Sequence, residues 1–226
     1  NGYQTGGRIE SLNDKIYLTV GDYNNWKFPQ NNESSFGKIL EINPNNKEYR
    51  IISKGHRNAQ GLKILSKEKK LLISTEHGPK GGDEVNIIDI NQNLFTNNYG
   101  WPMASYGIHY DVVPINSFTK KYAPLKKNHA KYGFIEPNYY FKEAIGISEI
   151  IQNYYSKKNQ YFVTSLKNKK IYLLEEENKT FNLIEEIDFG ERIRDIIFDQ
   201  ESKSYFLYLE NTPKVVKFNN IKWINL

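Results

Sequence analysis

A recurring pattern of short strands constrains this chain most. Each copy has one strand, a short polar turn, a second strand that ends in small or polar residues and, after a gap, a third strand. Apolar and polar residues alternate within these segments, and they are rich in Tyr, Ile, Phe and Val, which is typical of β-strands rather than helices. The four copies cover residues 9–22 with 38–42, 62–76 with 85–90, 147–165 with 170–175, and 193–209 with 214–218.

These repeats predict an all-β fold. Units of about 40 to 50 residues, each with several antiparallel strands, are typical of β-propeller blades. A sandwich with Greek-key turns is the alternative, but it does not require the same strand order to recur. We therefore expect residues 1–226 to form a single propeller domain with four visible blades. A strandless insert at about residues 106–137, rich in Pro and Lys, is either a loop over a central site or a disordered excursion.

Composition excludes several classes of protein. The chain of 226 residues is 38% hydrophobic and 25% charged, which suits a globular domain with a sizeable core. Its formal charge of +5 is spread over short runs, so we expect solvated loops and no nucleic-acid surface, even at the lysines of residues 120–131. The absence of cysteine excludes disulfides and thiol-bound metals. No apolar run approaches the roughly 18 residues of a membrane span, and residues 1–7 carry no secretory signal.

One glycine-rich loop has the composition of a calcium site. In the sequence TEHGPKGGDEVN, residues 75–86, a strand is followed directly by Gly, Pro, Gly and Gly and then by two carboxylates, Asp83 and Glu84. Glycines free main-chain carbonyls to point inward, and carbonyls with Asp or Glu are the ligands that calcium prefers. A glycine-rich turn with solvated acids is the alternative.

Cations also stand at strand ends. Lys167 ends one strand, and Arg192 and Arg194 lie two residues apart, so they share one face of the strand that opens the last unit. Adjacent like charges repel unless an anion lies between them. A ligand with several carboxylates or phosphates would supply that anion, and so would a surface salt-bridge network.

These segments together resemble a known family. In order and approximate spacing they are similar to the soluble pyrroloquinoline-quinone (PQQ) glucose/sorbosone dehydrogenases, or aldose sugar dehydrogenases, over nearly the whole chain except the insert. The combination is specific, although no single motif is. The matching motifs are GGRI, YLTVGD, GKILEINP, GHRNAQGL, TEHGPKGGDEVN, NNYGWPMASYG, SLKNKKIYLL and GERIRD.

The resemblance implies a six-bladed propeller with PQQ at one end of the channel, so about two N-terminal blades would be missing here. A ring without them has open sheet edges. We expect either a truncated chain, a companion polypeptide that completes the ring, or rearranged blades.

The resemblance also assigns roles to the cations. Arg57 and Asn58 match the pair that contacts the quinone, with the arginine polarising the reactive carbonyl oxygen. Lys167, Arg192 and Arg194 match the cations around the PQQ tricarboxylate, in agreement with the anion argument.

For the metal, the resemblance implies that the carbonyls of Gly78 and Pro79 bind calcium beside PQQ. Glu84 and Tyr99 match positions that hold a further calcium in some relatives. Calcium beside the quinone would act as a Lewis acid.

The expected catalytic base is substituted. In the family a histidine four residues before the arginine of GGRI removes the sugar hydroxyl proton, and counting back from Arg8 gives Gln4. Glutamine cannot accept a proton, and loss of a general base costs roughly 10² to 10⁴ in rate. Asp22 matches the carboxylate that orients that histidine.

Two functions follow from the resemblance. The first is a PQQ- and calcium-dependent oxidoreductase that oxidises an aldose or related sugar at C1 and passes electrons to a periplasmic acceptor. The second is a catalytically impaired propeller that binds a ligand or a partner, because Gln4 occupies the base position. Family resemblance implies a periplasmic or secreted location.

Overall fold

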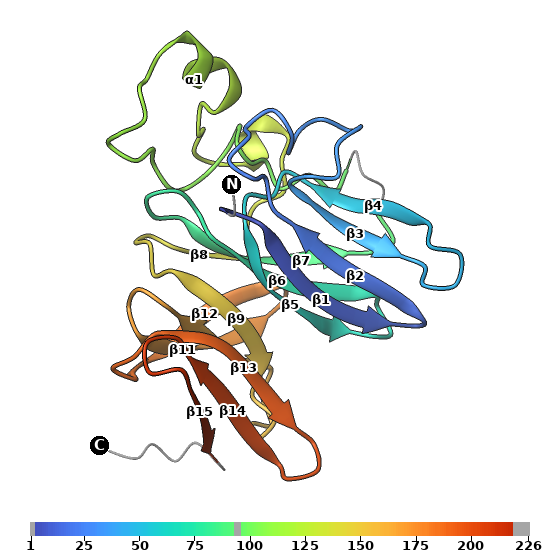
Figure 1. Cartoon of the computed structure of the whole chain (residues 1–226), viewed down its shortest axis with the longest axis vertical. Helices are drawn as coiled ribbons and strands as arrows, with labels where there is room; N and C mark the ends of the chain where they lie inside the picture. The colour runs from blue at the N-terminus through green and yellow to red at the C-terminus, as the bar shows by residue number, and fades with distance from the viewer. Residues whose placement is uncertain (1–2, 93–95, 219–226) are drawn as a thin grey trace. The chain divides into compact units, whose positions relative to one another are not determined.

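The structure, a computed structural model, describes residues 3–92 and 96–218. These residues group into two compact units, one within Asn1–Ala144 and the other within Ile145–Leu226. The described strands form four antiparallel sheets, two in each unit (Figure 1). None of the helices formed by residues 3–92 and 96–218 is both long and apolar enough to cross a membrane.

The first sheet of unit 1 runs in sequence order, β1-β2-β3-β4, which is the up-and-down order of a propeller blade. Asn13 and Asp14 join the first two strands, and both have the positive φ of a tight hairpin turn, 50° and 59°. The strands are β1 (Gly6–Leu12), β2 (Lys15–Val20), β3 (Lys38–Ile42) and β4 (Tyr49–Lys54).

A long loop between β2 and β3 carries one of the expected site residues, Asp22. The buried Lys38 anchors this loop, because its ammonium group donates to the carbonyls of Phe28, Pro29 and Phe36 at 2.9, 3.1 and 2.8 Å. Three acceptors take all three ammonium protons. The Lys38 side chain therefore fixes three points of this loop.

The second sheet, again in sequence order, is interrupted by the insert. Residues 106–137 contain the short helix α1 (Ser117–Tyr122) and the 3₁₀ turn η1 (Ala130–Tyr132), and the described residues of this range contain no strand. The sequence patterns did not predict the short helix. The strands of this sheet are β5 (Ala59–Ser66), β6 (Leu71–Glu76), β7 (Asp83–Asp89) and β8 (Tyr139–Phe141).

One apolar core joins the two sheets of unit 1. Strand β6 is buried along its whole length and β7 along all but its last residue, so the polar side chains of Asp83, Glu84 and Asn86 are buried together with the apolar ones. The innermost strands β1 and β5 lie against each other. The core side chains are Leu12, Tyr17, Ile39, Ile52, Leu62, Leu72, Ile88, Ile90 and Tyr99.

Unit 2 repeats the same construction. Its core centres on the fully buried Tyr205, whose hydroxyl donates to the carbonyl of Gln152 at 2.9 Å. One sheet has the order β12-β11-β10-β9, and the other is β13-β14-β15. The strands are β9 (Ile147–Gln152), β10 (Gln160–Ser165), β11 (Lys170–Glu177), β12 (Thr180–Asp188), β13 (Ile193–Asp199), β14 (Ser204–Leu209) and β15 (Lys214–Phe218).

The four predicted repeats correspond to the four sheets, so the predicted all-β class with four visible blades is confirmed. In every repeat the three predicted strands are the first three strands of a sheet. The patterns missed the outermost strands β4, β8 and β12. Strand β12 shows why, since it alternates poorly and most of its side chains are exposed.

Candidate functional site

Arg57 is at the centre of the candidate site in unit 1. It precedes β5 and is only 7% exposed. Its guanidinium donates to the carbonyls of Gly78 at 2.8 Å and His77 at 3.3 Å, and it lies 5.4 Å from the centre of the Trp101 ring. Carbonyl acceptors and an aromatic face together hold a planar cation in one orientation. The Arg57 guanidinium therefore contacts the glycine-rich loop within residues 75–86, for which the sequence predicts a calcium site.

A buried carboxylate fixes the backbone beneath Arg57. Glu76, the last residue of β6, accepts a hydrogen bond from the Arg57 main-chain nitrogen. Its other oxygen lies 2.9 Å from Nδ1 of His56, whose Nε2 lies 2.8 Å from the hydroxyl of Ser53. The His56 ring also stacks on Tyr99. Both His56 nitrogens are engaged, so this histidine is part of the framework.

Asp22 lies beside Arg57 and is fully buried. Its Oδ2 accepts from the indole nitrogen of Trp101 at 2.7 Å and its Oδ1 from the main-chain nitrogen of Asn24 at 2.8 Å. Burial raises the pKa of Asp22 to about 6, although the hydrogen bonds from Trp101 and Asn24 and the charge of Arg57 oppose the shift. The carboxylate is thus ionised at neutral pH and becomes protonated in mild acid.

Gln4 joins Asp22 to Arg57. With its amide nitrogen turned toward Asp22, Gln4 donates to Oδ1 at 2.6 Å, and its amide oxygen accepts from Nη2 of Arg57 at 2.9 Å. This orientation matches a donor to a carboxylate and an acceptor to a cation. The position at which the resemblance predicts a catalytic base is therefore occupied by a bridging amide, which cannot take up a proton.

Asn58, next to Arg57, is half-engaged. Its side-chain oxygen accepts from the main-chain nitrogen of Gly6 at 3.1 Å and from the amide of Gln60 at 3.0 Å. Its amide nitrogen makes no hydrogen bond to any residue that the structure describes. That nitrogen is available to a ligand.

The loop of residues 77–82, here called the carbonyl loop, presents the two expected calcium-binding carbonyls. The Gly78 carbonyl accepts from Arg57 as described, and the Pro79 carbonyl accepts from the Tyr110 hydroxyl at 2.9 Å. Gly78 also donates its main-chain nitrogen to Asp83 at 2.9 Å. A side chain at position 78 would overlap the carbonyls of Gly81 and Gly82, so the fold of the loop requires glycine there.

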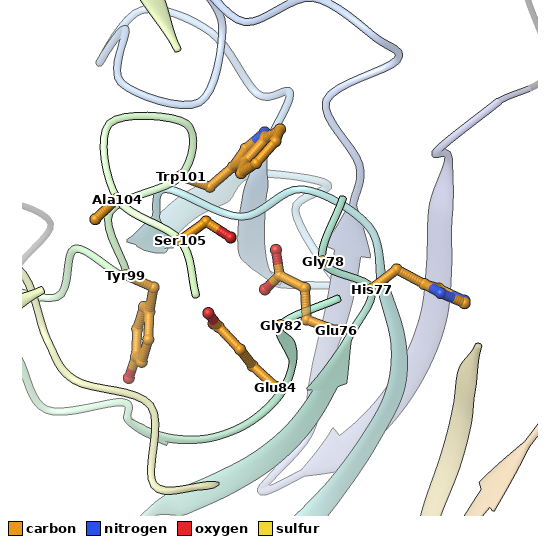
Figure 2. A pocket seen from close by; sticks show the side chains of 9 residues that line it. All are labelled: Glu76, His77, Gly78, Gly82, Glu84, Tyr99, Trp101, Ala104 and Ser105. Carbon is orange, nitrogen blue, oxygen red and sulfur yellow. The ribbon is translucent and has the colours of Figure 1, made fainter. Parts of the chain in front are cut away.

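A small pocket opens beside this loop (Figure 2). Glu76 and Glu84 direct their carboxylates into it, whereas the His77 ring points away. Burial and then the charge of Glu76 raise the pKa of Glu84 well above its ordinary value. The Tyr99 hydroxyl faces elsewhere and donates to the carbonyl of Ile87 at 2.7 Å. The pocket is lined by Glu76, His77, Gly78, Gly82, Glu84, Tyr99, Trp101, Ala104 and Ser105.

The donors around this pocket suit a hard cation only in part. Among the described residues, no three His, Asp or Glu side chains come together as a metal cluster. Main-chain carbonyls and two carboxylates are present instead, and such oxygens are what calcium binds. The structure thus brings Gly78, Glu84 and Tyr99 to one pocket, with Pro79 next in the same loop.

The other three expected cations belong to unit 2. Arg192 and Arg194 both hydrogen-bond to Glu210, one to each carboxylate oxygen. Burial raises the pKa of Glu210, but the bonds from Arg194 and Arg192 outweigh burial and hold it below its ordinary value. Lys167 is exposed, and no residue that the structure describes pairs with its side chain. Within this unit the anion between the two arginines is therefore a glutamate.

Sequence reasoning missed four residues of these arrangements: Glu76, Trp101, Tyr110 and Glu210. Glu210 had a readable signal, because pairing β13 with β14 in a hairpin places it opposite Arg192, whose carbonyl accepts from its main-chain nitrogen at 2.9 Å. Trp101 and Tyr110 meet the site through distant parts of the chain, and no local spacing shows that.

Comparison with known proteins gives the family. The sequence model of the Glucose / Sorbosone dehydrogenase family matches residues 1–217. The chain is 28% identical over 221 residues to the aldose sugar dehydrogenase YliI of Escherichia coli, covering 89% of this chain and 56% of that protein. It is 29% identical over 135 residues to quinoprotein glucose dehydrogenase B of Acinetobacter calcoaceticus, covering 46% of this chain and 27% of that protein.

A solved structure agrees with the sequence match. The soluble aldose sugar dehydrogenase of Escherichia coli, in its apo form, superposes with a TM-score of 0.75 at 25% identity, covering 94% of this chain and 62% of that one. The chain thus spans a little over half the length of its Escherichia coli relative. With the match to the family model along almost its whole length, the chain belongs to the glucose/sorbosone dehydrogenase family.

Proposed function

We propose that this chain takes part in the PQQ- and calcium-dependent oxidation of an aldose or related sugar at C1, in a periplasmic or secreted setting. The family and the names of its sugar-dehydrogenase relatives support this reaction class. When bound, PQQ would accept the hydride and calcium would polarise the quinone. The observation that carries the proposal is the buried Arg57 guanidinium, fixed against the Gly78 carbonyl.

Arg57 would hold the quinone oxygen, and Asn58 would donate its unused amide nitrogen beside it. A buried cation that is already oriented stabilises developing negative charge without reorganising. Trp101 contributes twice, since its ring lies under Arg57 and its indole nitrogen fixes Asp22. These contacts exclude water from one side of the guanidinium and set its direction before any ligand arrives.

The calcium assignment fits the oxygen donors of the loop. The carbonyls of Gly78 and Pro79 each accept one hydrogen bond, and a carbonyl oxygen has a second lone pair for a cation. Glu84 would serve a further calcium, since its carboxylate faces the pocket. Tyr99 lines the same pocket, but its hydroxyl is bonded to the Ile87 carbonyl, so its side chain would not be a ligand. A divalent ion there would offset the repulsion between two buried carboxylates.

Lys167, Arg192 and Arg194 would supply positive charge to the carboxylates of PQQ. Lys167 has no partner among the described side chains, so no carboxylate of the described residues offsets its charge. The two arginines share one glutamate, so the trio with Glu210 keeps a net positive charge. Arginine binds carboxylates through paired hydrogen bonds, which suits a flat tri-acid.

A second function is supported by one specific observation, the bridging of Asp22 and Arg57 by Gln4. Because the amide cannot take the sugar proton, the chain would bind PQQ or a sugar without efficient turnover. It would then act as a ligand-binding or interaction module. Where PQQ binds, the two functions differ in whether the sugar proton is removed.

Reconstitution tests the first function. The chain is loaded with calcium and PQQ and mixed with a panel of aldoses and a dye acceptor, and we expect sugar-dependent bleaching of the dye. Bound PQQ without turnover on any sugar would favour the binding module instead. Failure to bind PQQ at all would contradict the first function and the assignment of the cations to PQQ.

Replacing Gln4 separates the two functions. We expect Gln4→His to raise the rate of sugar oxidation by roughly 10² to 10⁴, because the new imidazole accepts the proton and Asp22 can orient it. The matched control is Gln92→His, at an exposed position of the same unit. If both variants leave the rate unchanged while PQQ stays bound, the base position is not what limits turnover.

A further inference from the structure

The start of the insert is tied to the carbonyl loop. Lys80 and Ile108 exchange two main-chain hydrogen bonds, at 2.9 and 3.1 Å, as an isolated antiparallel bridge. Residues 105–111 are here called the insert limb. Lys80 also pairs with Asp111, but both side chains are well exposed, so this pair adds little. The main-chain bridge sets the distance between limb and loop.

Glycines make the contact closer than side chains would allow. Gly82 has a φ of +70°, and a Cβ there would overlap the main chain of Gly107. A Cβ on Gly107 would in turn overlap the carbonyl of Gly81 and the ring of Pro79. Backbone therefore packs directly on backbone, and neither segment can shift without the other.

A lysine also fixes the insert limb. The Lys127 ammonium donates to the carbonyl of Ser105 at 2.9 Å and to the carbonyl of Gly107. The insert limb thus has fixed contacts both to Lys127 and to the carbonyl loop. A side chain projecting from it toward the loop has a defined position.

Tyr110 is that side chain, and its hydroxyl donates to the Pro79 carbonyl at 2.9 Å. We propose that Tyr110 is a positioning residue that orients the Pro79 carbonyl for the cation beside PQQ. The inference rests on the proposed function, because the cation is part of it. The hydroxyl uses one lone pair of the oxygen and leaves the second for the cation, so the hydrogen bond fixes the direction of the remaining lone pair.

The test compares two tyrosine-to-phenylalanine variants in the full chain. Tyr110→Phe removes the hydroxyl that contacts Pro79. Tyr132→Phe removes a hydroxyl from the same insert that makes no hydrogen bond to any described residue, and it serves as the matched control. Calcium binding by calorimetry, the absorption spectrum of added PQQ and amide hydrogen exchange at Lys80 and Ile108 are measured for each.

We expect Tyr110→Phe to weaken calcium binding roughly three- to tenfold, as loss of one net hydrogen bond predicts. The bound PQQ spectrum should shift, while the Lys80 and Ile108 amides stay protected and Tyr132→Phe behaves as wild type. Unchanged or tighter calcium binding would overturn the assignment. So would weaker binding accompanied by loss of protection throughout the insert, because the role would then be structural. If the wild type binds neither calcium nor PQQ, the proposed function falls together with the assignment.

Discussion

Arginines are held in opposite ways in the two units. In unit 1, Arg57 is buried, and neutral carbonyls and an aromatic ring hold it, with Asp22 nearby and linked to it through Gln4. In unit 2, Arg192 and Arg194 are about one-third exposed and bind a carboxylate directly. No carboxylate of the described residues hydrogen-bonds directly to the Arg57 side chain, so less of its charge is offset than at Arg192 and Arg194, which both bond to Glu210.

Of the arginines in the two units, we expect the replacement of Arg57 to weaken PQQ binding most. We expect Arg57→Met to raise the Kd for PQQ about 100-fold, because removing a buried, hydrogen-bonded charge commonly costs roughly 2–5 kcal/mol. Arg192→Met and Arg194→Met should each raise it by less than about tenfold, as partly exposed and partly neutralised charges do. Titration of PQQ in the presence of calcium measures all three.

The control for this series is Arg50→Met, which removes a half-exposed arginine paired with Glu41 in unit 1. It should leave PQQ binding unchanged. The comparison between the two units would break if Arg192→Met weakened binding more than Arg57→Met did.

The strands show how much of the fold could be predicted from the sequence. The first three strands of every sheet were predictable because β6 and β7, for example, carry nearly unbroken runs of buried side chains. Among the fourth strands, the edge strand β12 shows no alternation and most of its side chains are exposed. Pairing with a neighbouring strand defines such an edge, and pattern alone does not reveal it.

For the site, the motifs identified Arg57, Gly78 and Glu84, which the structure brings to one region. What the motifs lacked was the set of partners. Trp101 lies 79 residues from Asp22 in the chain yet donates to it at 2.7 Å. Such contacts depend on how loops from different strands converge. The chemistry of a side chain was therefore predictable, but its neighbours and its pKa were not.

Asp22 in unit 1 and Glu210 in unit 2 should change the stability of the fold with pH in opposite directions. Burial raises the pKa of Asp22 from 3.8 to about 6, so the folded chain holds this proton more tightly than the unfolded chain does. As the pH rises from about 4 to about 6, the wild type should therefore lose stability relative to Asp22→Asn, by up to about 3 kcal/mol.

The stability that Glu210 contributes changes with pH in the opposite direction. Hydrogen bonds from Arg194 and Arg192 hold its pKa below 4.5, so its contribution to stability is present above that pH and is lost as the pH falls. The wild type should therefore gain stability relative to Glu210→Gln as the pH rises. Urea unfolding from about pH 3 to about pH 8 covers the range of both groups, with Asp111→Asn as an exposed control. Slopes of equal sign for the two variants would show that the two carboxylates do not differ in the way described.

The smallest effect concerns the charge that Glu210 offsets. We expect Glu210→Gln to lower the Kd for PQQ roughly two- to fivefold, because the amide keeps the shape of the side chain but leaves both arginine charges available to the ligand's carboxylates. The gain should shrink as salt is added, since the group is partly exposed and screened. Glu186→Gln, which breaks the Lys170 pair of the same unit, should leave the Kd unchanged. An unchanged or higher Kd for Glu210→Gln would mean that Arg192 and Arg194 serve only to hold Glu210, so that the salt-bridge alternative is their whole role.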